Sequence, residues 1–191
     1  MKALEEKILK EGKVLPGNIL KVGSFLNHKL DVKFLMKMGE EIAELYKNSG
    51  VNKIVTIETS GIPIAFAAGY CLDVPVVFAK KNKSSNVSGG VYSSVVHSYT
   101  HNTDYTVIIE SDYLCADDKV LIVDDFLANG KALLGLLDII EQAGAQTVGA
   151  AVAIEKGFQQ GGKELRKSGV RVESLAIIDS MSDDSLTFRE Q

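Results

Sequence analysis

Two adjacent aspartates, Asp124 and Asp125, directly follow four apolar residues at 120–123. Neighbouring carboxylates at the end of a strand repel each other, so the pair is a poor structural choice unless a ligand binds between them. Ionised carboxylates accept hydrogen bonds, and the vicinal hydroxyls of a ribose are suitable donors. The pair therefore predicts a site for a sugar ring.

A loop of small residues lies shortly after the aspartates and opens a helix. Its backbone N–H groups and the positive end of the helix dipole suit a phosphate group. Carboxylates for a ribose followed by a loop for a phosphate form the layout expected of a ribose 5-phosphate site. The loop consists of Ala128, Asn129, Gly130, Lys131 and Ala132.

Polar groups also follow the other predicted strands, at the edge where a parallel sheet binds its ligands. Loops are commonly polar, so each of these groups taken alone is more readily explained as solvated surface. Together with the acidic pair they favour one site at one edge of the sheet. They are the turn Glu58-Thr59-Ser60-Gly61, the pair Lys80-Lys81 and the pair Glu155-Lys156.

Other nucleotide and catalytic motifs do not occur in the sequence. A P-loop requires Ser or Thr after its Gly-Lys pair, but Gly130 and Lys131 are followed by Ala132. No G-x-G-x-x-G segment follows a strand, and neither H-E-x-x-H nor G-x-S-x-G is present.

Strand and helix patterns alternate from position 53 to 177, and the strands are almost continuously apolar. Such strands are covered on both faces, so the fold class expected is α/β, with a central, mostly parallel sheet flanked by helices. The strands are expected at 53–57, 75–79, 120–123, 147–154 and 170–177, and the later helices at about 131–143 and 163–168.

The N-terminal third and the middle of the chain have different patterns. Residues 1–11 predict an amphipathic helix, 14–26 an irregular strand and loop, and Asp31 the N-cap of a further helix. The polar segment 82–90 predicts a mobile loop, and the runs 91–99 and 105–110 a hairpin arm.

Length and composition limit the classes of protein. The 191 residues, 46% hydrophobic, suit one domain over 1–191. A net charge of −4 without a Lys/Arg block does not suggest a nucleic-acid partner. We expect no signal peptide and no membrane span, and therefore a cytoplasmic location.

The segment VLIVDDFLANGKA at 120–132 resembles the phosphoribosyl-pyrophosphate (PRPP) motif of the type I phosphoribosyltransferases. Its departures from the common motif, at Asn129, Lys131 and Ala132, resemble the branch of bacterial xanthine phosphoribosyltransferases. The likeness extends along the chain through ILKVGSFLNH, KIVTIETSGI, VPVVFAKK and AIEKGFQ. It implies the type I fold, with an N-terminal hood at about 12–30 and a flexible loop at about 82–105.

The resemblance also implies roles for individual residues on the PRPP side. Asp124 and Asp125 would hold the ribose hydroxyls and serve catalysis, and residues 128–132 would hold the 5-phosphate. Ser60 and Gly61 would donate backbone N–H groups to pyrophosphate, although a plain tight turn remains an alternative. Lys81, beside Lys80, would reach the pyrophosphate, in some members of the family across a dimer interface.

On the base side, the resemblance implies contacts from Leu20, Asn27, Lys156 and Phe158. The Lys156 ammonium would donate to a 6-oxo group, and the Asn27 amide to the 2-oxo group of xanthine. Phe158 would stack on the ring, although an ordinary core position explains it as well. Asn27 is equally explained as a cap beside Asp31.

The activity implied is transfer of the ribose-phosphate of PRPP to xanthine, giving xanthosine 5′-monophosphate and pyrophosphate. Mg²⁺ would be bound through PRPP rather than by direct protein ligands, and a homodimer is expected. Two alternatives remain open: a hypoxanthine/guanine phosphoribosyltransferase, and a non-catalytic PRPP-binding regulator.

Overall fold

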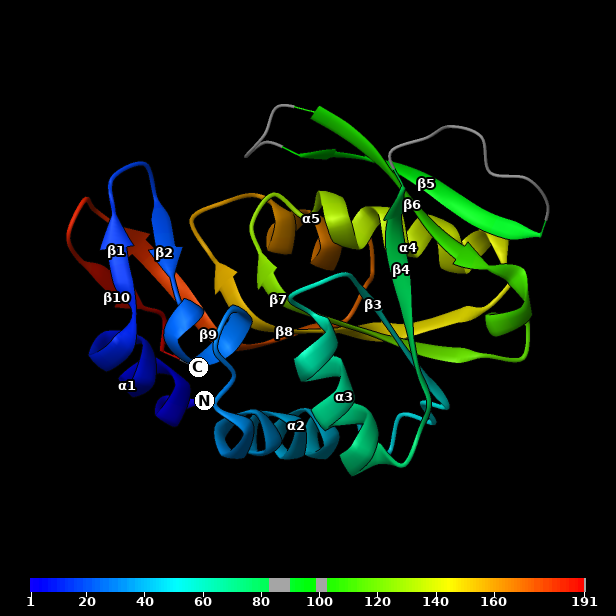
Figure 1. The fold of residues 1–191 in the computed structure, drawn as a ribbon, viewed down its shortest axis with the longest axis horizontal. Helices are drawn as coiled ribbons and strands as arrows, with labels where there is room; N and C mark the ends of the chain where they lie inside the picture. The colour runs from blue at the N-terminus through cyan, green and yellow to red at the C-terminus, as the bar shows by residue number, and fades with distance from the viewer. Residues whose placement is uncertain (83–89, 99–102, 191) are drawn as a thin grey trace.

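The computed structural model describes residues 1–82, 90–98 and 103–190. Within them, eight strands form one twisted sheet in the order β10-β9-β8-β7-β3-β4-β6-β5 (Figure 1). The five strands from β9 to β4 are parallel, whereas β10, β6 and β5 pair antiparallel with their neighbours. The strands are β3 (Lys53–Ile57), β4 (Val76–Asn82), β5 (Val91–Ser98), β6 (Thr103–Glu110), β7 (Lys119–Leu127), β8 (Gln146–Lys156), β9 (Val172–Met181) and β10 (Leu186–Phe188).

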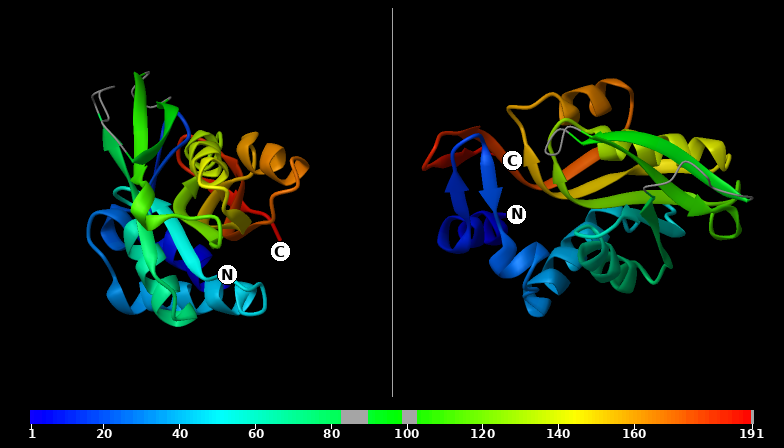
Figure 2. Two further views of the ribbon diagram at one scale, coloured as in Figure 1. Left: turned by 90° about the vertical axis from the view of Figure 1, so that its right-hand side faces the viewer. Right: turned by 45° about the horizontal axis from the view of Figure 1, so that its top comes forward.

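Helices cover both faces of the sheet, as predicted (Figures 1 and 2). Helices α2 (Val32–Tyr46) and α3 (Ile62–Leu72) pack on one face, and α4 (Lys131–Gln142) and α5 (Gly161–Lys167) lie on the other. The central strand β7 contributes side chains to the core on each face. Leu121 and Val123 belong to the core on the α2–α3 side. Val120 and Ile122 belong to the core on the α4 side. Alternating residues of one apolar run therefore fill two separate cores.

The N-terminal segment packs against the far end of the sheet. Helix α1 (Lys2–Glu11) is followed by a hairpin of β1 (Lys13–Leu15) and β2 (Ile19–Lys21) and by a π-helical turn, Gly23–Asn27. The hairpin agrees with the irregular strand expected at 14–26. The expectation of a loop in the rest of that segment is wrong, because residues 23–27 form a π-helical turn. That turn is stabilised by burial of its Phe25 and Leu26 side chains in the core.

Four strands, β4, β7, β8 and β9, extend further at their carboxyl ends than predicted. The sequence places Asp124 and Asp125 after the strand, but β7 continues to Leu127, because β8 runs beside it and pairs Asp124 with Val152 and Leu127 with Glu155. Strands β4 and β8 likewise continue through the lysine pair and through Lys156. Polar residues were interpreted as strand ends although their backbones still have partners in the sheet.

Other elements agree with the patterns or add to them. Asp31 caps α2, because its carboxylate accepts a hydrogen bond from the Phe34 N–H at 3.1 Å. Strands β5 and β6 form the expected hairpin arm, which packs against α4. Strand β10 was not predicted. Among the described residues, none of the helices combines the length and apolar character that a membrane crossing requires.

Candidate active site

A pocket of about 220 Å³ opens at the carboxyl ends of β3 and β7. The turn after β3 surrounds it together with the acidic pair and the first turn of α4, which follow each other in the chain, and Lys81 and Tyr105 come from two further strands. This is the edge at which an open α/β sheet binds ligands. The lining residues are Ile57, Glu58, Thr59, Ser60, Lys81, Tyr105, Asp124, Asp125, Phe126 and Ala132.

The two aspartates form one hydrogen-bonded unit. The Asp125 N–H donates to Asp124 Oδ1 at 2.9 Å, and the Phe126 N–H donates to Asp125 Oδ1 at 3.0 Å. Asp125 Oδ2 accepts from the Asn27 side-chain amide at 3.1 Å. The hood segment therefore reaches the acidic pair through Asn27, at a position predicted to contact the base.

Burial dominates the electrostatics of the pair. The Asp124 side chain is only 5% exposed, and loss of solvation followed by repulsion from Asp125 raises its pKa well above the ordinary value. Burial also raises the pKa of Asp125, although the hydrogen bond from Asn27 opposes the rise. The Lys81 charge lowers the pKa of Asp124 too weakly to compensate. The site therefore favours ligands that bring hydrogen-bond donors or positive charge.

The turn after β3 lies directly against Asp124. A Cβ atom at Gly61 would lie 2.9 Å from Asp124 Oδ1 and 2.2 Å from Thr56 Oγ1, so no side chain fits there. Ser60 lines the pocket, and the peptide bond between Glu58 and Thr59 is cis. The predicted pyrophosphate residues and the acidic pair therefore belong to one site.

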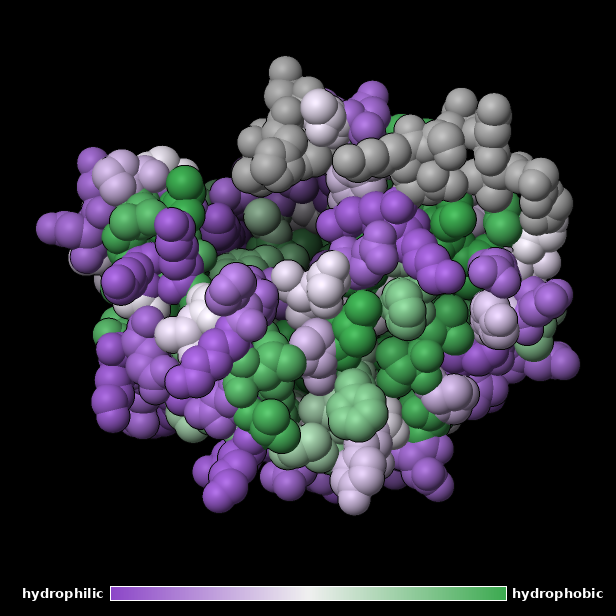
Figure 3. All heavy atoms as spheres, in the orientation of Figure 1, coloured by the Kyte–Doolittle hydropathy of each residue, from purple (hydrophilic) through white to green (hydrophobic). Residues whose placement is uncertain are grey.

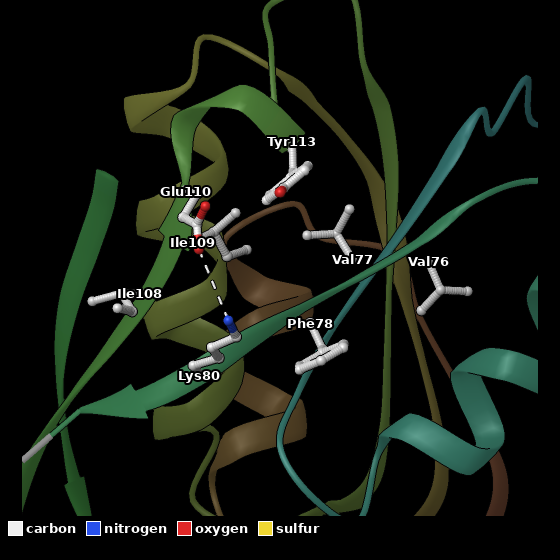
Figure 4. Close-up of a pocket in the computed structure, with 8 residues that line it drawn as sticks. All are labelled: Val76, Val77, Phe78, Lys80, Ile108, Ile109, Glu110 and Tyr113. Atoms are coloured by element: carbon white, nitrogen blue, oxygen red, sulfur yellow. Dashed lines mark ion pairs between the residues drawn. The ribbon is translucent and has the colours of Figure 1, made fainter. Parts of the chain in front are cut away.

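The two consecutive lysines of β4 point to different sides. Lys81 lines the pocket, with its ammonium 5.3 Å from the centre of the Tyr105 ring. Lys80 instead pairs with Glu110 at 3.8 Å, beside an apolar pocket formed by β4, β6 and Tyr113 (Figure 4). Neighbouring strand residues alternate in direction, so only Lys81 is available to an anion at the acidic pair.

The loop at 128–132, predicted to bind phosphate, is held by a hydrogen bond within the loop and by one from the start of α5. Gly130 has a φ of +79°, which a side chain would strain, and the Lys131 N–H donates to Asn129 Oδ1 at 3.2 Å. The Ala128 carbonyl accepts from the Gly161 N–H at 3.1 Å. Of the five predicted residues, Ala132 lines the described pocket, and the other four lie on the chain that leads into it.

The predicted base residues are spread around the hood. Lys156 donates to the Asn18 carbonyl at 2.8 Å and lies 6.0 Å from the centre of the Phe126 ring. Burial lowers the pKa of its ammonium. Leu20 is 8% exposed and packs in the core, and Phe158 is partly buried against the same core. The structure therefore places Lys156 and Asn27 beside the acidic strand, while Leu20 and Phe158 belong to the core against which Phe126 packs.

Three of the lining residues, Ile57, Phe126 and Tyr105, are not among the predicted site residues. Phe126 directly follows the acidic pair within the segment 120–132, but the pattern assigned it no role. Tyr105 comes from the hairpin arm, where burial and the Asp124 charge raise the pKa of its hydroxyl. No local pattern links this tyrosine to the aspartates, because the contact depends on how the arm folds back. Residues 83–89 of the expected mobile loop lie outside the described residues, so this loop stays a prediction.

Comparison with known proteins agrees with this geometry. Residues 23–183 match the phosphoribosyl transferase domain family. The chain belongs to this family. As a phosphoribosyl transferase, it is 51% identical to xanthine phosphoribosyltransferase of Oceanobacillus iheyensis over 191 residues, which is all of this chain and 98% of that protein. It is 54% identical to xanthine phosphoribosyltransferase 1 of Clostridium perfringens over 190 residues, covering 99% of this chain and 100% of the relative.

Solved structures show the same phosphoribosyl transferase fold. Adenine phosphoribosyltransferase of Giardia lamblia, complexed with 9-deazaadenine, has a TM-score of 0.75 at 19% identity and covers 93% of this chain and 98% of its own. The enzyme of Rhodothermus marinus has a TM-score of 0.74 at 22% identity, covering 93% and 100%. The type I fold expected from the sequence is therefore confirmed.

Replacing the buried carboxyl by its neutral isostere is expected to stabilise the protein. The pKa of Asp124 is raised in the folded chain, so stability falls as the pH rises above the unfolded value of about 3.9. Asp124→Asn removes that loss. At pH 7.5 we expect melting roughly 2–4 °C above wild type, the shift that about 1 kcal/mol gives in a chain of this size, and no gain near pH 3.5.

Calorimetry at the two pH values measures this effect, with the exposed Asp183→Asn as the matched control. The control is expected to melt with the wild type at both pH values. If Asp124→Asn melts no higher than wild type at pH 7.5, burial of the ionised Asp124 carboxylate does not reduce the stability of the folded protein.

Proposed function

We propose that the chain is a xanthine phosphoribosyltransferase, which converts xanthine and PRPP to xanthosine 5′-monophosphate and pyrophosphate. The observation that carries the proposal is the buried acidic pair, bordered by the glycine turn and followed by the phosphate loop, in a chain about half identical to proteins of that name. In this proposal the acidic pair binds the ribose, the glycine turn binds the pyrophosphate, and the loop at 128–132 binds the 5-phosphate.

In the proposed reaction a purine ring nitrogen attacks the anomeric carbon of the ribose. The carbon–nitrogen bond forms, the bond to pyrophosphate oxygen breaks with its electron pair leaving on pyrophosphate, and the nitrogen loses its proton. Positive charge grows on the ribose ring, so the carboxylates beneath it stabilise the transition state. Asp124 and Asp125 would hold the ribose hydroxyls, which fixes the reacting carbon in place.

The remaining PRPP residues act by position and charge. Ser60 and Gly61 would offer N–H groups to pyrophosphate, and Lys81 a positive charge on the same side of the pocket. Residues 128–132 would hold the 5-phosphate at the start of α4, where the helix dipole favours an anion.

Mg²⁺ would bind at this site together with PRPP. Mg²⁺ typically keeps several waters and takes one or two carboxylates together with substrate phosphates. In this site the ion would be bound through PRPP rather than by direct protein ligands, and its positive charge beside Asp124 and Asp125 would offset the burial that raises the pKa of both carboxyl groups. When bound, the ion would neutralise the pyrophosphate leaving group.

Base choice would depend on Lys156 and Asn27. An ammonium at Lys156 donates to a 6-oxo group and has no acceptor for the 6-amino group of adenine. The Asn27 amide has a second N–H besides the one given to Asp125, and this N–H is suited to a 2-oxo oxygen. Leu20 and Phe158 remain predicted base contacts. The hood at about 12–30, the loop at about 82–105 and a cytoplasmic location likewise remain predictions.

Pyrophosphate release in the presence of Mg²⁺, PRPP and one base at a time tests the proposal. We expect xanthine to react fastest, ahead of guanine and hypoxanthine, with adenine inactive. Lys156→Gln is expected to raise the KM for xanthine at least about tenfold, since a hydrogen bond to a charged group contributes about 1.5–3 kcal/mol, and to leave the KM for PRPP within about twofold.

The exposed Lys37→Gln on α2 serves as the matched control and is expected to leave both KM values unchanged. Equal rates with guanine or hypoxanthine would replace the xanthine assignment by a broader 6-oxopurine enzyme. Binding of PRPP without release with any base would identify a regulator instead.

We further propose a homodimer that buries the outer face of α3 and β4. On this face Phe66 and Tyr70 are 65% and 74% exposed, and Phe78 and Tyr113 are also exposed. Hydrophobic side chains gather over α3 and the neighbouring strand (Figure 3). Aromatic residues clustered in this way are typical of protein interfaces.

Phe66→Asp is expected to dissociate the dimer, because it places a charge where apolar surface would be buried. Leu9→Asp, at a position 64% exposed on α1, is the matched control and should remain dimeric. Sedimentation at micromolar concentration measures both. A monomeric wild-type protein, or a dimer that Phe66→Asp leaves intact, would contradict this interface.

A further inference from the structure

An ion pair between the buried carboxylate of Glu155 and the partly exposed guanidinium of Arg166 lies behind the predicted phosphate loop, outside the site described above. The Glu155 side chain, near the end of β8, is 3% exposed and accepts two hydrogen bonds from the Arg166 guanidinium of α5, at 2.8 and 2.7 Å. Ser174 donates to the same carboxylate, and Arg166 also donates to the Val172 carbonyl at 3.2 Å. Burial favours a raised pKa for Glu155, but these hydrogen bonds outweigh it and lower the pKa. The sequence suggested a solvated polar group here, which is wrong.

The ion pair contacts the start of α5 without any side chain between them. A Cβ atom at Gly162 would lie 2.0 Å from Glu155 Oε1 and 2.7 Å from Arg166 Nη1. The carboxylate therefore rests on the backbone of α5. Any displacement of the ion pair must move this backbone, since close-packed interiors transmit strain.

The preceding glycine makes the corresponding contact with the phosphate loop. A Cβ atom at Gly161 would lie 2.5 Å from the Ala128 carbonyl oxygen and 2.5 Å from the Gly130 nitrogen. The Gly161 N–H also donates to the Ala128 carbonyl at 3.1 Å. Two consecutive glycines therefore connect the ion pair to the loop: Gly162 contacts the ion pair, and Gly161 contacts the loop.

We propose that Glu155 and Arg166 are positioning residues for PRPP, which fix the phosphate loop through Gly161 and Gly162. This inference rests on the proposed function, because it assigns the 5-phosphate of PRPP to residues 128–132. The loop offers backbone N–H groups, whose affinity for phosphate depends on their direction. A loop held by α5 has its N–H groups oriented before the substrate arrives, which lowers the cost of binding.

The effect should be confined to the phosphate side of the active site. Glu155 and Lys156 are adjacent in β8, so their side chains point to opposite faces. Glu155 turns to α5, whereas Lys156 turns to the hood and donates to the Asn18 carbonyl. Loss of the Glu155 charge is therefore expected to alter PRPP binding and to leave the base contacts in place.

Glu155→Gln tests the inference, because it keeps the shape of the side chain but removes its charge. We expect the KM for PRPP, and its Kd measured by calorimetry with Mg²⁺ and without base, to rise at least about tenfold. The KM for xanthine and kcat should change by less than about threefold. Ser174→Ala, a milder change that removes one hydrogen bond to the same carboxylate, should raise the KM for PRPP by about two- to threefold if Glu155→Gln does not fold.

The matched control is Glu173→Gln, which breaks the 2.8 Å pair between Arg171 and Glu173 on the neighbouring strand. The Glu173 charge raises the pKa of Arg166 only from a distance, and the pair makes no hydrogen bond to α5 among the described residues, so PRPP binding should stay at the wild-type value. A lower melting temperature for Glu155→Gln with an unchanged Kd for PRPP would overturn the proposal and leave a purely structural ion pair.

The design separates this inference from the proposed function. A wild-type protein that binds PRPP but releases no pyrophosphate with xanthine contradicts the proposed function, while the calorimetric comparison still decides the role of Glu155. A wild-type protein that does not bind PRPP overturns both. An equal rise in Kd for Glu155→Gln and Glu173→Gln would overturn the inference alone, because the effect would not be specific to α5.

Discussion

The constraint on which the site depends is a pair of adjacent carboxylates in the central strand, one of them buried (Asp124) and the other half-buried (Asp125). Asp124 lies between β3 and β8 with almost no access to solvent, and its neighbour is a second acid. Ionising such a pair is unfavourable in the free protein, so its pKa values are raised. A ligand that brings hydroxyl donors and a cation relieves this cost, which under the proposed function would concentrate binding energy at the ribose.

The surrounding structure keeps this arrangement in place. Gly61 leaves no room for a side chain beside Asp124, and the amide of Asn27 is directed at Asp125. Behind the loop at 128–132, Gly161 lies against that loop and Gly162 against the Glu155–Arg166 pair, which we propose fixes the loop in position. The protein thus performs little covalent chemistry in this account, and its contribution is the prior orientation of charges and N–H groups.

The sequence predicted the parts of the fold and site that depend on local pattern. The apolar run before Asp124 predicted a strand covered on both faces, which is confirmed. The small residues around Gly130 predicted the loop that opens α4, while the binding of phosphate by this loop stays a prediction. Contacts between distant segments could not be predicted in this way. Tyr105 reaches the pocket only because the hairpin arm folds back, and Glu155 meets Arg166 only because α5 packs behind β8. Polarity alone also placed the ends of β7 and β8 too early, since backbone pairing continues through charged residues.

The measurement that tests the account most directly is the titration of Asp124 by carbon-13 NMR of its carboxyl group, assigned with the Asp124→Asn protein. In the free protein, the account predicts an apparent pKa above the ordinary value of about 3.9, shared with Asp125 as a coupled pair. Addition of PRPP and Mg²⁺ should lower it. An Asp124 that titrates at or below the ordinary value without ligand would contradict the claim that a buried, ligand-dependent acidic pair organises this site.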